Sequence, residues 1–216
     1  MRQASHAHDE MPMAVDGNRL TPIVDGPARL AALLALIEGA HASLRLYYYI
    51  FGNDVTGTAV REALLDAINR GVRVTLIVDG FGSGGTPPGF FAPLEAAGCA
   101  FRRFLPRYGR RYLLRNHQKM VIADEGTAII GGFNIADDYF APREAGKWHD
   151  LGLGVKGPAV RWLVRYFDVL DEWVGSDKPS WRALRKLLER ALPQQQGPLR
   201  WLLGGPTRRL SPWART

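Results

Sequence analysis

The chain has 216 residues, of which 46% are hydrophobic and 23% are charged; these values suit a folded domain with a sizeable core and exclude wholesale disorder. No apolar run approaches the ~20 residues of a membrane span, and the single cysteine, Cys99, excludes an internal disulfide. The net charge of +7 is uneven, because residues 178–216 hold nine Lys or Arg against one acidic residue.

The first half of the chain predicts alternating helices and strands. We expect a flexible leader over residues 1–16 and a folded unit over 17–176. Apolar residues at helical or strand spacing predict three helices, over 27–40, 56–69 and 90–97, and three strands, over 44–50, 72–78 and 100–105. Such alternation favours βαβ units, so the expected class is α/β, with helices packed on a parallel or mixed sheet.

From residue 118 onward the pattern changes to shorter strands. Strands over 118–123 and 127–130 are joined by a turn at Asp124, an arrangement typical of a β-hairpin. We expect a further strand over 151–155 and an amphipathic helix over 158–174. The remaining residues, 177–216, are interpreted as a basic helical linker, with a helix over 181–192 and a possible strand over 199–203.

Two basic side chains lie close together at the start of the predicted hairpin. On a strand, His117 and Lys119 project from the same face, so an imidazole and an ammonium would share one pocket. The ammonium can hold the anionic oxygens of a phosphodiester while a neutral imidazole attacks phosphorus or moves a proton. Gly131 and Gly132 would let the backbone approach a bulky phosphate, and Asn134 can add an amide donor.

A cluster of seven Lys or Arg residues lies between positions 102 and 119, with no acidic residue among them. Such a positive field attracts phosphates, whether of nucleic acid or of anionic lipid. Charge alone does not distinguish these two, and a solvated surface is a third interpretation. Within the cluster, Arg115 is a candidate substrate contact.

The pattern His117-x-Lys119-x4-Asp124-x6-Gly131-Gly132-x-Asn134 resembles the HKD signature of the phospholipase D superfamily. Its surroundings resemble the bacterial cardiolipin synthase branch of that superfamily, notably residues 48–51, 79–83 and 148–150. The resemblance runs almost continuously over residues 17–175. It implies an α/β/α sandwich of phospholipase D type, built on a mixed sheet and forming one half of a two-motif enzyme.

The resemblance also implies a role for each residue of the motif. His117 would be the nucleophile that forms a phosphohistidine, and Lys119 and Asn134 would bind the phosphoryl oxygens. Asp124 would support the motif structurally. Asp150 would be the carboxylate that orients His117 through its second ring nitrogen, which agrees with the need to keep the attacking nitrogen deprotonated and aimed.

Two departures from the branch stand out. His149 precedes Asp150 where the branch has an arginine, so His149 is either a substitute donor to the substrate or a bystander. The second departure is that the chain contains a single HKD motif, whereas the superfamily's working site needs two. Either two chains pair about a two-fold axis, or this chain is the N-terminal half of a longer enzyme. The resemblance of residues 199–206 to the strand that opens a second half favours the longer enzyme.

The expected activity is phosphatidyl transfer resembling that of cardiolipin synthase. A phosphatidyl group would pass from phosphatidylglycerol to His117 and then to an alcohol acceptor, or to water in a hydrolytic variant. No metal or organic cofactor is implied. We expect a cytoplasmic protein that is peripheral to the inner membrane.

Two other functions stay open. A homodimeric nuclease could use the basic cluster to follow a nucleic acid backbone, and salt-sensitive DNA cleavage without lipid turnover would favour it. A non-catalytic half-domain could bind anionic membrane through its tail, and vesicle binding without any product would favour that interpretation.

Overall fold

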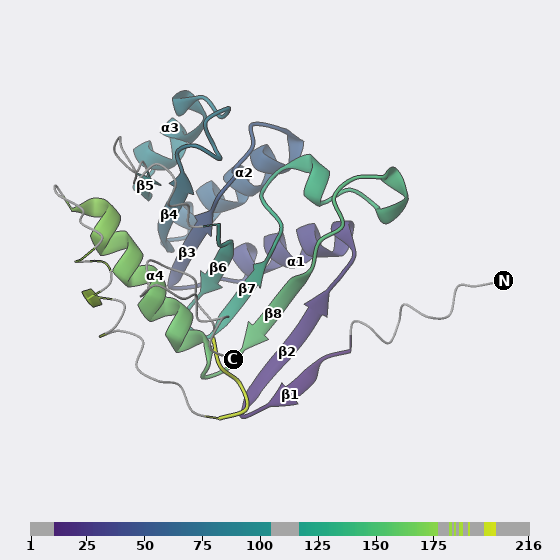
Figure 1. Ribbon diagram of the computed structural model, residues 1–216. Coiled ribbons are helices and arrows are strands. Elements are labelled where there is room, and N and C mark those ends of the chain that lie inside the picture. Colours follow the sequence, from purple (N-terminus) through teal and green to yellow (C-terminus); the bar gives the residue numbers. More distant parts are fainter. Residues whose placement is uncertain are drawn as a thin grey trace.

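The computed structural model describes residues 11–104, 117–176, 182, 184, 186, 187, 190 and 197–201. In this part of the chain, eight strands form one mixed sheet in the order β1-β2-β8-β7-β6-β3-β4-β5 (Figure 1). The strands are β1 (Met13–Val15), β2 (Asn18–Ile23), β3 (Ser43–Tyr48), β4 (Arg73–Asp79), β5 (Ala100–Phe104), β6 (Met120–Ala123), β7 (Thr127–Gly131) and β8 (Gly152–Lys156). The α-helices are α1 (Gly26–Glu38), α2 (Val55–Asn69), α3 (Pro88–Ala96) and α4 (Val160–Gly175).

The parallel part of the sheet comes from two βαβ units. Strands β3, β4 and β5 are parallel neighbours, connected through α2 and α3. Helix α2 begins where the Asp54 carboxylate accepts the N–H of Gly57 at 2.8 Å, and α1 begins where Asp25 accepts the N–H of Ala28 at 3.0 Å. Strands β6, β7 and β8 pair antiparallel, and β6 also pairs antiparallel with β3. The predicted mixed sheet is therefore confirmed.

Two apolar cores lie on opposite faces of the sheet, and the alternation of side chains along each strand divides residues between them. Tyr48 packs in the core beneath α1, α2 and α3, whereas its neighbour Tyr47 packs in the core beneath α4. Neither tyrosine is exposed. Figure 1 shows α4 crossing one face of the sheet with α1 and α2 behind it, so the predicted α/β/α layering is confirmed.

The first two strands are not predicted by the sequence, and residues 13–15, assigned to the flexible leader, form β1. Pro22 lies within β2 and weakens the strand pattern, because proline cannot donate a ladder hydrogen bond. The strand tolerates it because β1 pairs only with residues 18–20, which leaves Pro22 without a neighbour on that side. Antiparallel pairing with β8 completes β2.

The C-terminal segment packs on the α4 side of the sheet in the residues that are described. Leu184 is buried there, and Leu187, Leu199 and Trp201 pack against the same core. The Trp201 indole donates a hydrogen bond to the carbonyl of Ala159 at 2.9 Å. The five described residues between 182 and 190 are helical, whereas the described residues 199–201 form no strand, contrary to the expectation for 199–203. The rest of the predicted helix and strand lies outside the described residues.

None of the helices in the described ranges combines the length and the apolar character that crossing a bilayer requires.

Candidate active site

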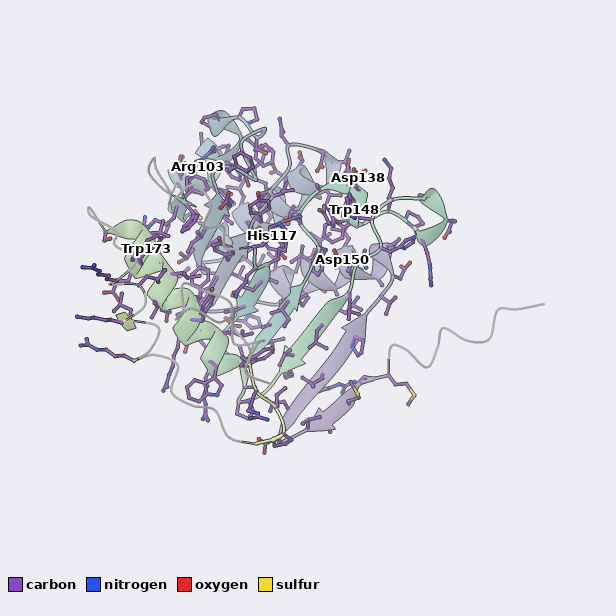
Figure 2. The ribbon with its side chains drawn as sticks, in the orientation of Figure 1. Arg103, His117, Asp138, Trp148, Asp150 and Trp173 are labelled. Atoms are coloured by element: carbon purple, nitrogen blue, oxygen red, sulfur yellow. The ribbon has the colours of Figure 1, made fainter. Side chains whose placement is uncertain are left out.

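The sheet topology brings the motif residues to one edge. Parallel strands β3 and β4 end at this edge, and β6 begins there because it runs antiparallel to β3. For the same reason β7 ends there and β8 begins there. His117 and Lys119 precede β6, Asn134 follows β7, and Asp150 precedes β8, so all four lie at one end of the sheet. Figure 2 shows His117 and Asp150 near each other at this end.

The imidazole and the ammonium of the motif are in direct contact, as expected, although the strand begins only at Met120, so His117 and Lys119 precede it instead of sharing a strand face. Lys119 Nζ lies 2.9 Å from His117 Nδ1 and donates to the His117 carbonyl at 2.7 Å. Lys119 is only 3% exposed, whereas His117 is exposed. Because an ammonium has no lone pair, Nδ1 accepts this hydrogen bond as long as Lys119 is charged. The pair therefore presents an exposed imidazole held by a buried cation.

Burial changes the proton affinity of both groups. Desolvation lowers the pKa of His117, the charge of Lys119 lowers it further, and the carboxylate of Asp79 opposes both effects. Desolvation also lowers the pKa of Lys119 to about 8, against the opposing charge of Asp150. The imidazole is therefore kept neutral at neutral pH, which is the state a nucleophile needs.

Asn134 is 1% exposed and is held by the chain that follows β3. Its Oδ1 accepts the N–H of Ile50 at 3.0 Å. This bond orients the amide and leaves Nδ2 as the donor that could face a phosphate oxygen.

Asp124 lies in the β6–β7 turn at the other end of β6 from His117. Its carboxylate accepts the backbone N–H groups of His41, Ala42 and Ser43 at 2.8 to 2.9 Å. Desolvation acts to raise the pKa of Asp124, but these three hydrogen bonds outweigh it, and the pKa is lowered. Asp124 thus ties the hairpin to the start of β3 and makes only structural contacts here.

Asp150 lies near His117 and Lys119, and its charge acts on Lys119. Its Oδ1 accepts the N–H of Leu151 at 2.9 Å, and its backbone carbonyl accepts from the Arg29 guanidinium. Among the described residues, no hydrogen bond joins the Asp150 carboxylate to His117, whose Nδ1 faces Lys119 instead. Orientation of His117 by Asp150 therefore stays a prediction.

The glycine pair is packed against protein atoms. A Cβ at Gly131 would lie 2.5 Å from the Leu151 carbonyl oxygen, and a Cβ at Gly132 would lie 2.3 Å from Asp150 Oδ1. The structure thus supplies a reason for both glycines that the sequence does not reveal, namely close approach of the strand to the segment that carries Asp150. The approach of a phosphate to the same glycines stays a prediction.

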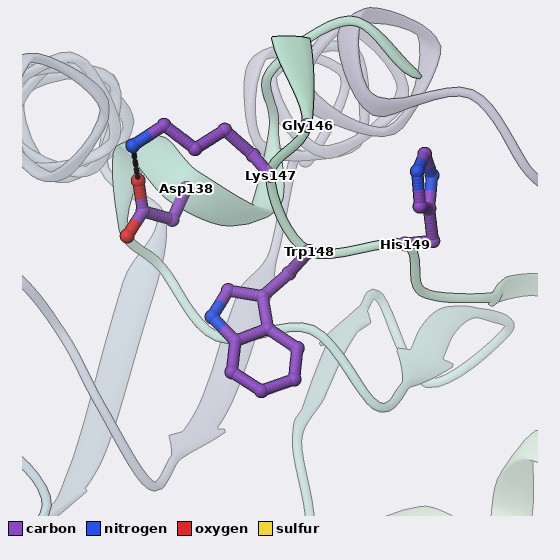
Figure 3. Close-up of a pocket in the computed structure, with 5 residues that line it drawn as sticks. All are labelled: Asp138, Gly146, Lys147, Trp148 and His149. Atoms are coloured by element: carbon purple, nitrogen blue, oxygen red, sulfur yellow. Dashed lines mark ion pairs between the residues drawn. The ribbon is translucent and has the colours of Figure 1, made fainter. Parts of the chain in front are cut away.

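His149 is exposed and lines a shallow pocket with Asp138, Gly146, Lys147 and Trp148. Figure 3 shows the His149 ring and the Trp148 ring directed to different sides of the chain, and the ion pair of 2.9 Å between Lys147 and Asp138. No contact of His149 with His117 or Lys119 is present among the described residues, so a substrate role for His149 stays a prediction. Arg115 lies outside the described residues.

Three residues near the site receive no role from the sequence analysis, although Tyr49 and Asp79 lie in the segments 48–51 and 79–83 that resemble the cardiolipin synthase branch. Arg29, 1% exposed on α1, holds the segment that carries Asp150. Tyr49 places its ring 4.3 Å from the His117 ring, centroid to centroid. Asp79, fully buried at the end of β4, acts electrostatically on His117. The resemblance of residues 79–83 to the cardiolipin synthase branch is a signal that could have indicated Asp79.

Solved structures share this fold at low sequence identity. Nuc from Salmonella typhimurium, described as a phospholipase D family member, matches with a TM-score of 0.55 and 20% identity, over 79% of this chain and 100% of that one. NucT from Helicobacter pylori matches with a TM-score of 0.58 and 16% identity, over 72% and 96%. Phosphatidylserine synthase from Haemophilus influenzae matches with a TM-score of 0.56 and 10% identity, over 85% and 45%.

Sequence relatives point to one branch. A cardiolipin synthase from Listeria monocytogenes is 38% identical over 148 residues, which are 66% of this chain and 31% of that protein. The major cardiolipin synthase ClsA of Bacillus subtilis is 34% identical over 161 residues, or 72% and 33%. The chain thus spans about a third of the length of these curated relatives. The family model described as "Cardiolipin synthase, PLD-like domain" matches residues 33–169, and the chain belongs to this family.

Proposed function

We propose that this chain is one catalytic half of a phosphatidyltransferase that acts through a phosphohistidine on His117, as in cardiolipin synthesis. The observation that carries the proposal is the contact of 2.9 Å between a buried ammonium and an exposed imidazole at the sheet edge. A buried cation beside an uncharged nucleophile suits an anionic phosphodiester, which supplies the missing counter-charge. Membership of the cardiolipin synthase family supports a phospholipid as the substrate.

The chemistry proceeds in two displacements. A phosphoryl oxygen of phosphatidylglycerol replaces the imidazole as the acceptor of the Lys119 ammonium, because a charged oxygen is the stronger acceptor. A nitrogen of His117 then attacks phosphorus, the phosphorus–oxygen bond to glycerol breaks, and the departing glycerol oxygen takes a proton from a second histidine. An acceptor hydroxyl next gives its proton to that histidine and attacks phosphorus, which breaks the phosphorus–nitrogen bond. Water in place of the alcohol gives hydrolysis.

The second histidine must come from another HKD motif, either in an identical chain or in a second half. A homodimer and a longer two-motif chain would both support this chemistry, because each places a second imidazole opposite His117. Residues 178–216 carry a local excess of positive charge that would hold the protein at an anionic membrane surface. We propose a peripheral location at the cytoplasmic face of the inner membrane.

The test is to trap the covalent intermediate. The chain is incubated with phosphatidylglycerol labelled in its phosphate and quenched in alkali, and acid-labile label on the protein is measured. We expect label on the wild type and none on His117→Asn. His41→Asn is the matched control, because His41 is exposed at the opposite end of the sheet and its hydrogen bond to Asp124 comes from its backbone N–H, which the substitution keeps.

The same preparations separate the other functions. Absence of label together with salt-sensitive cleavage of DNA would contradict the lipid assignment in favour of a nuclease. Binding to anionic vesicles without label or product, equally in wild type and His117→Asn, would contradict catalysis and favour a membrane-binding module.

A further inference from the structure

The aromatic ring of Tyr49 packs against both His117 and Lys119. Tyr49 directly follows β3, at the edge where His117 and Lys119 precede β6. Its ring centroid lies 4.3 Å from that of His117, with an angle of 53° between the ring planes. The Lys119 ammonium lies 5.5 Å from the same Tyr49 centroid, within the range of a cation–π contact. One ring therefore contacts both functional groups of the motif.

The backbone of Tyr49 is held by the turn that follows β4. Ser83 is 1% exposed, and its hydroxyl donates to the Tyr49 carbonyl at 3.1 Å while it accepts the N–H of Phe51 at 3.0 Å. Gly82 approaches so closely that a Cβ there would lie 2.3 Å from the Tyr49 carbonyl oxygen. A buried hydroxyl that bridges two backbone groups leaves the chain little freedom to move.

Hydrogen bonds to Asp79 stabilise the turn of residues 79–83. The carboxylate Oδ1 of Asp79 accepts the N–H groups of Phe81 and Gly82, each at 2.9 Å, and the N–H of Ser83 donates to the Asp79 carbonyl, also at 2.9 Å. The side chain is fully buried at the end of β4. The turn is thus anchored to the sheet at one end and to the Tyr49 backbone at the other.

We infer that Tyr49 is a positioning residue of this site: its ring holds the His117 imidazole and the Lys119 ammonium together and shields from water the side of the imidazole that it contacts, and the turn of residues 79–83 holds Tyr49 in place. The inference deepens the proposed function and rests on it for its catalytic meaning. The aromatic ring of Tyr49, and not its hydroxyl, makes these contacts, because no hydrogen bond from the hydroxyl to His117 or Lys119 is present among the described residues. Tyr49→Phe should therefore keep the arrangement, whereas Tyr49→Ala should open it to water.

The decisive measurement is the titration of the His117 imidazole by NMR, which requires no turnover. Its resonances are assigned by their loss in His117→Asn. In the wild type, desolvation lowers the pKa of His117. We expect Tyr49→Phe to retain the wild-type midpoint and Tyr49→Ala to raise it, because water then reaches the charged form of the ring. An unchanged midpoint in Tyr49→Ala would overturn the inference.

Two further variants keep the test decisive. Ser83→Ala removes the bridge to the Tyr49 carbonyl, and we expect a smaller rise of the same sign. Should Tyr49→Ala fail to fold, as judged from its backbone amide spectrum, Tyr49→Leu takes its place, because it keeps apolar volume but loses the flat ring. Failure of phosphohistidine trapping would refute the proposed function and leave the titration result standing, so the two can be told apart.

Discussion

The proposed reaction needs His117 deprotonated and Lys119 protonated, so the two residues limit activity at opposite ends of the pH range. In the proposed mechanism His117 attacks only when neutral and Lys119 binds phosphate only when charged. Activity should therefore rise as pH passes above the pKa of His117, which desolvation chiefly lowers below the usual 6.5. It should fall as pH passes the pKa of Lys119, which desolvation lowers to about 8. With a phosphodiester whose leaving group needs no proton, such as p-nitrophenolate, the second histidine does not contribute. We therefore expect a bell-shaped profile for phosphohistidine formation with such a donor, with its acid limb below pH 6.5 and its alkaline limb near pH 8.

Asp150→Asn provides the control for that profile. The Asp150 charge raises the pKa of Lys119, so its removal should move the alkaline limb to lower pH. An alkaline limb that stays in place in the variant would contradict the assignment of this limb to Lys119.

Arg29 is a buried cation whose guanidinium donates to three backbone carbonyls. Nη1 donates to Val24 at 2.7 Å and also to Asp150, and Nη2 donates to Tyr139 at 2.5 Å. Arg29→Met leaves these carbonyls without their donor, and we expect a loss of about 2–4 kcal/mol in the free energy of unfolding, measured with urea. The control Arg73→Met, at an exposed position, should change it by less than about 1 kcal/mol. Equal losses in both variants would contradict this role for Arg29.

At the scale of elements, periodicity alone predicts most of the layering. The alternation of apolar residues gives β3, β4 and β5 with their connecting helices. The expected proximity of His117 and Lys119 is observed, although both residues precede β6. The alternation does not give β1 and β2, because Pro22 and the polar residues of β2 hide the strand pattern. Strand β2 depends on pairing with β8, more than 120 residues further along the chain, and β1 pairs only with β2.

The contacts that hold the site could not be predicted for a related reason. Arg29 contacts Tyr139 and Asp150, and Tyr49 contacts His117, so each pair is joined only by the folded topology. A single sequence carries no periodic signal for a pair of this kind. The motif spacing predicts which side chains react, whereas the sheet order determines which side chains hold them.

The close packing of β7 against the segment before β8 gives a matched pair of glycine variants. A Cβ at Gly132 would lie 2.3 Å from Asp150 Oδ1 and force that carboxylate to move, whereas a Cβ at Gly126, in the β6–β7 turn, meets nothing closer than 3.7 Å. We expect Gly132→Ala to reduce phosphohistidine formation at least about tenfold by displacing Asp150 from the site, and Gly126→Ala to leave it near the wild-type rate. Similar rates in the two variants would show that the position of Asp150 does not matter.

At the scale of the whole molecule, one sheet edge brings the motif residues together, with Lys119 and Asn134 buried and the His117 imidazole exposed. The parallel strands β3 and β4 end there, and the antiparallel strands β6 and β8 begin there, so segments far apart in sequence converge around an exposed imidazole. An exposed nucleophile with a buried cation can bind and attack a phosphodiester, but protonation of the leaving oxygen needs another acid. The geometry of this half therefore favours pairing with a second HKD motif across the same edge.

If two identical chains share one active site, mixing wild-type and variant chains should lower turnover by a calculable fraction. If one site needs His117 from each of two chains, a pair that contains one His117→Asn chain cannot turn over, because it lacks either the nucleophile or the acid. When the wild type is unfolded and refolded with an equal amount of His117→Asn, each wild-type chain should keep about half of its turnover, and about a tenth with a tenfold excess. His41→Asn in place of His117→Asn should cause no such loss. Turnover that depends only on the amount of wild-type chain would contradict sharing between identical chains. Absence of turnover from the wild-type chain alone would instead direct the search for the second histidine to another half of a longer protein.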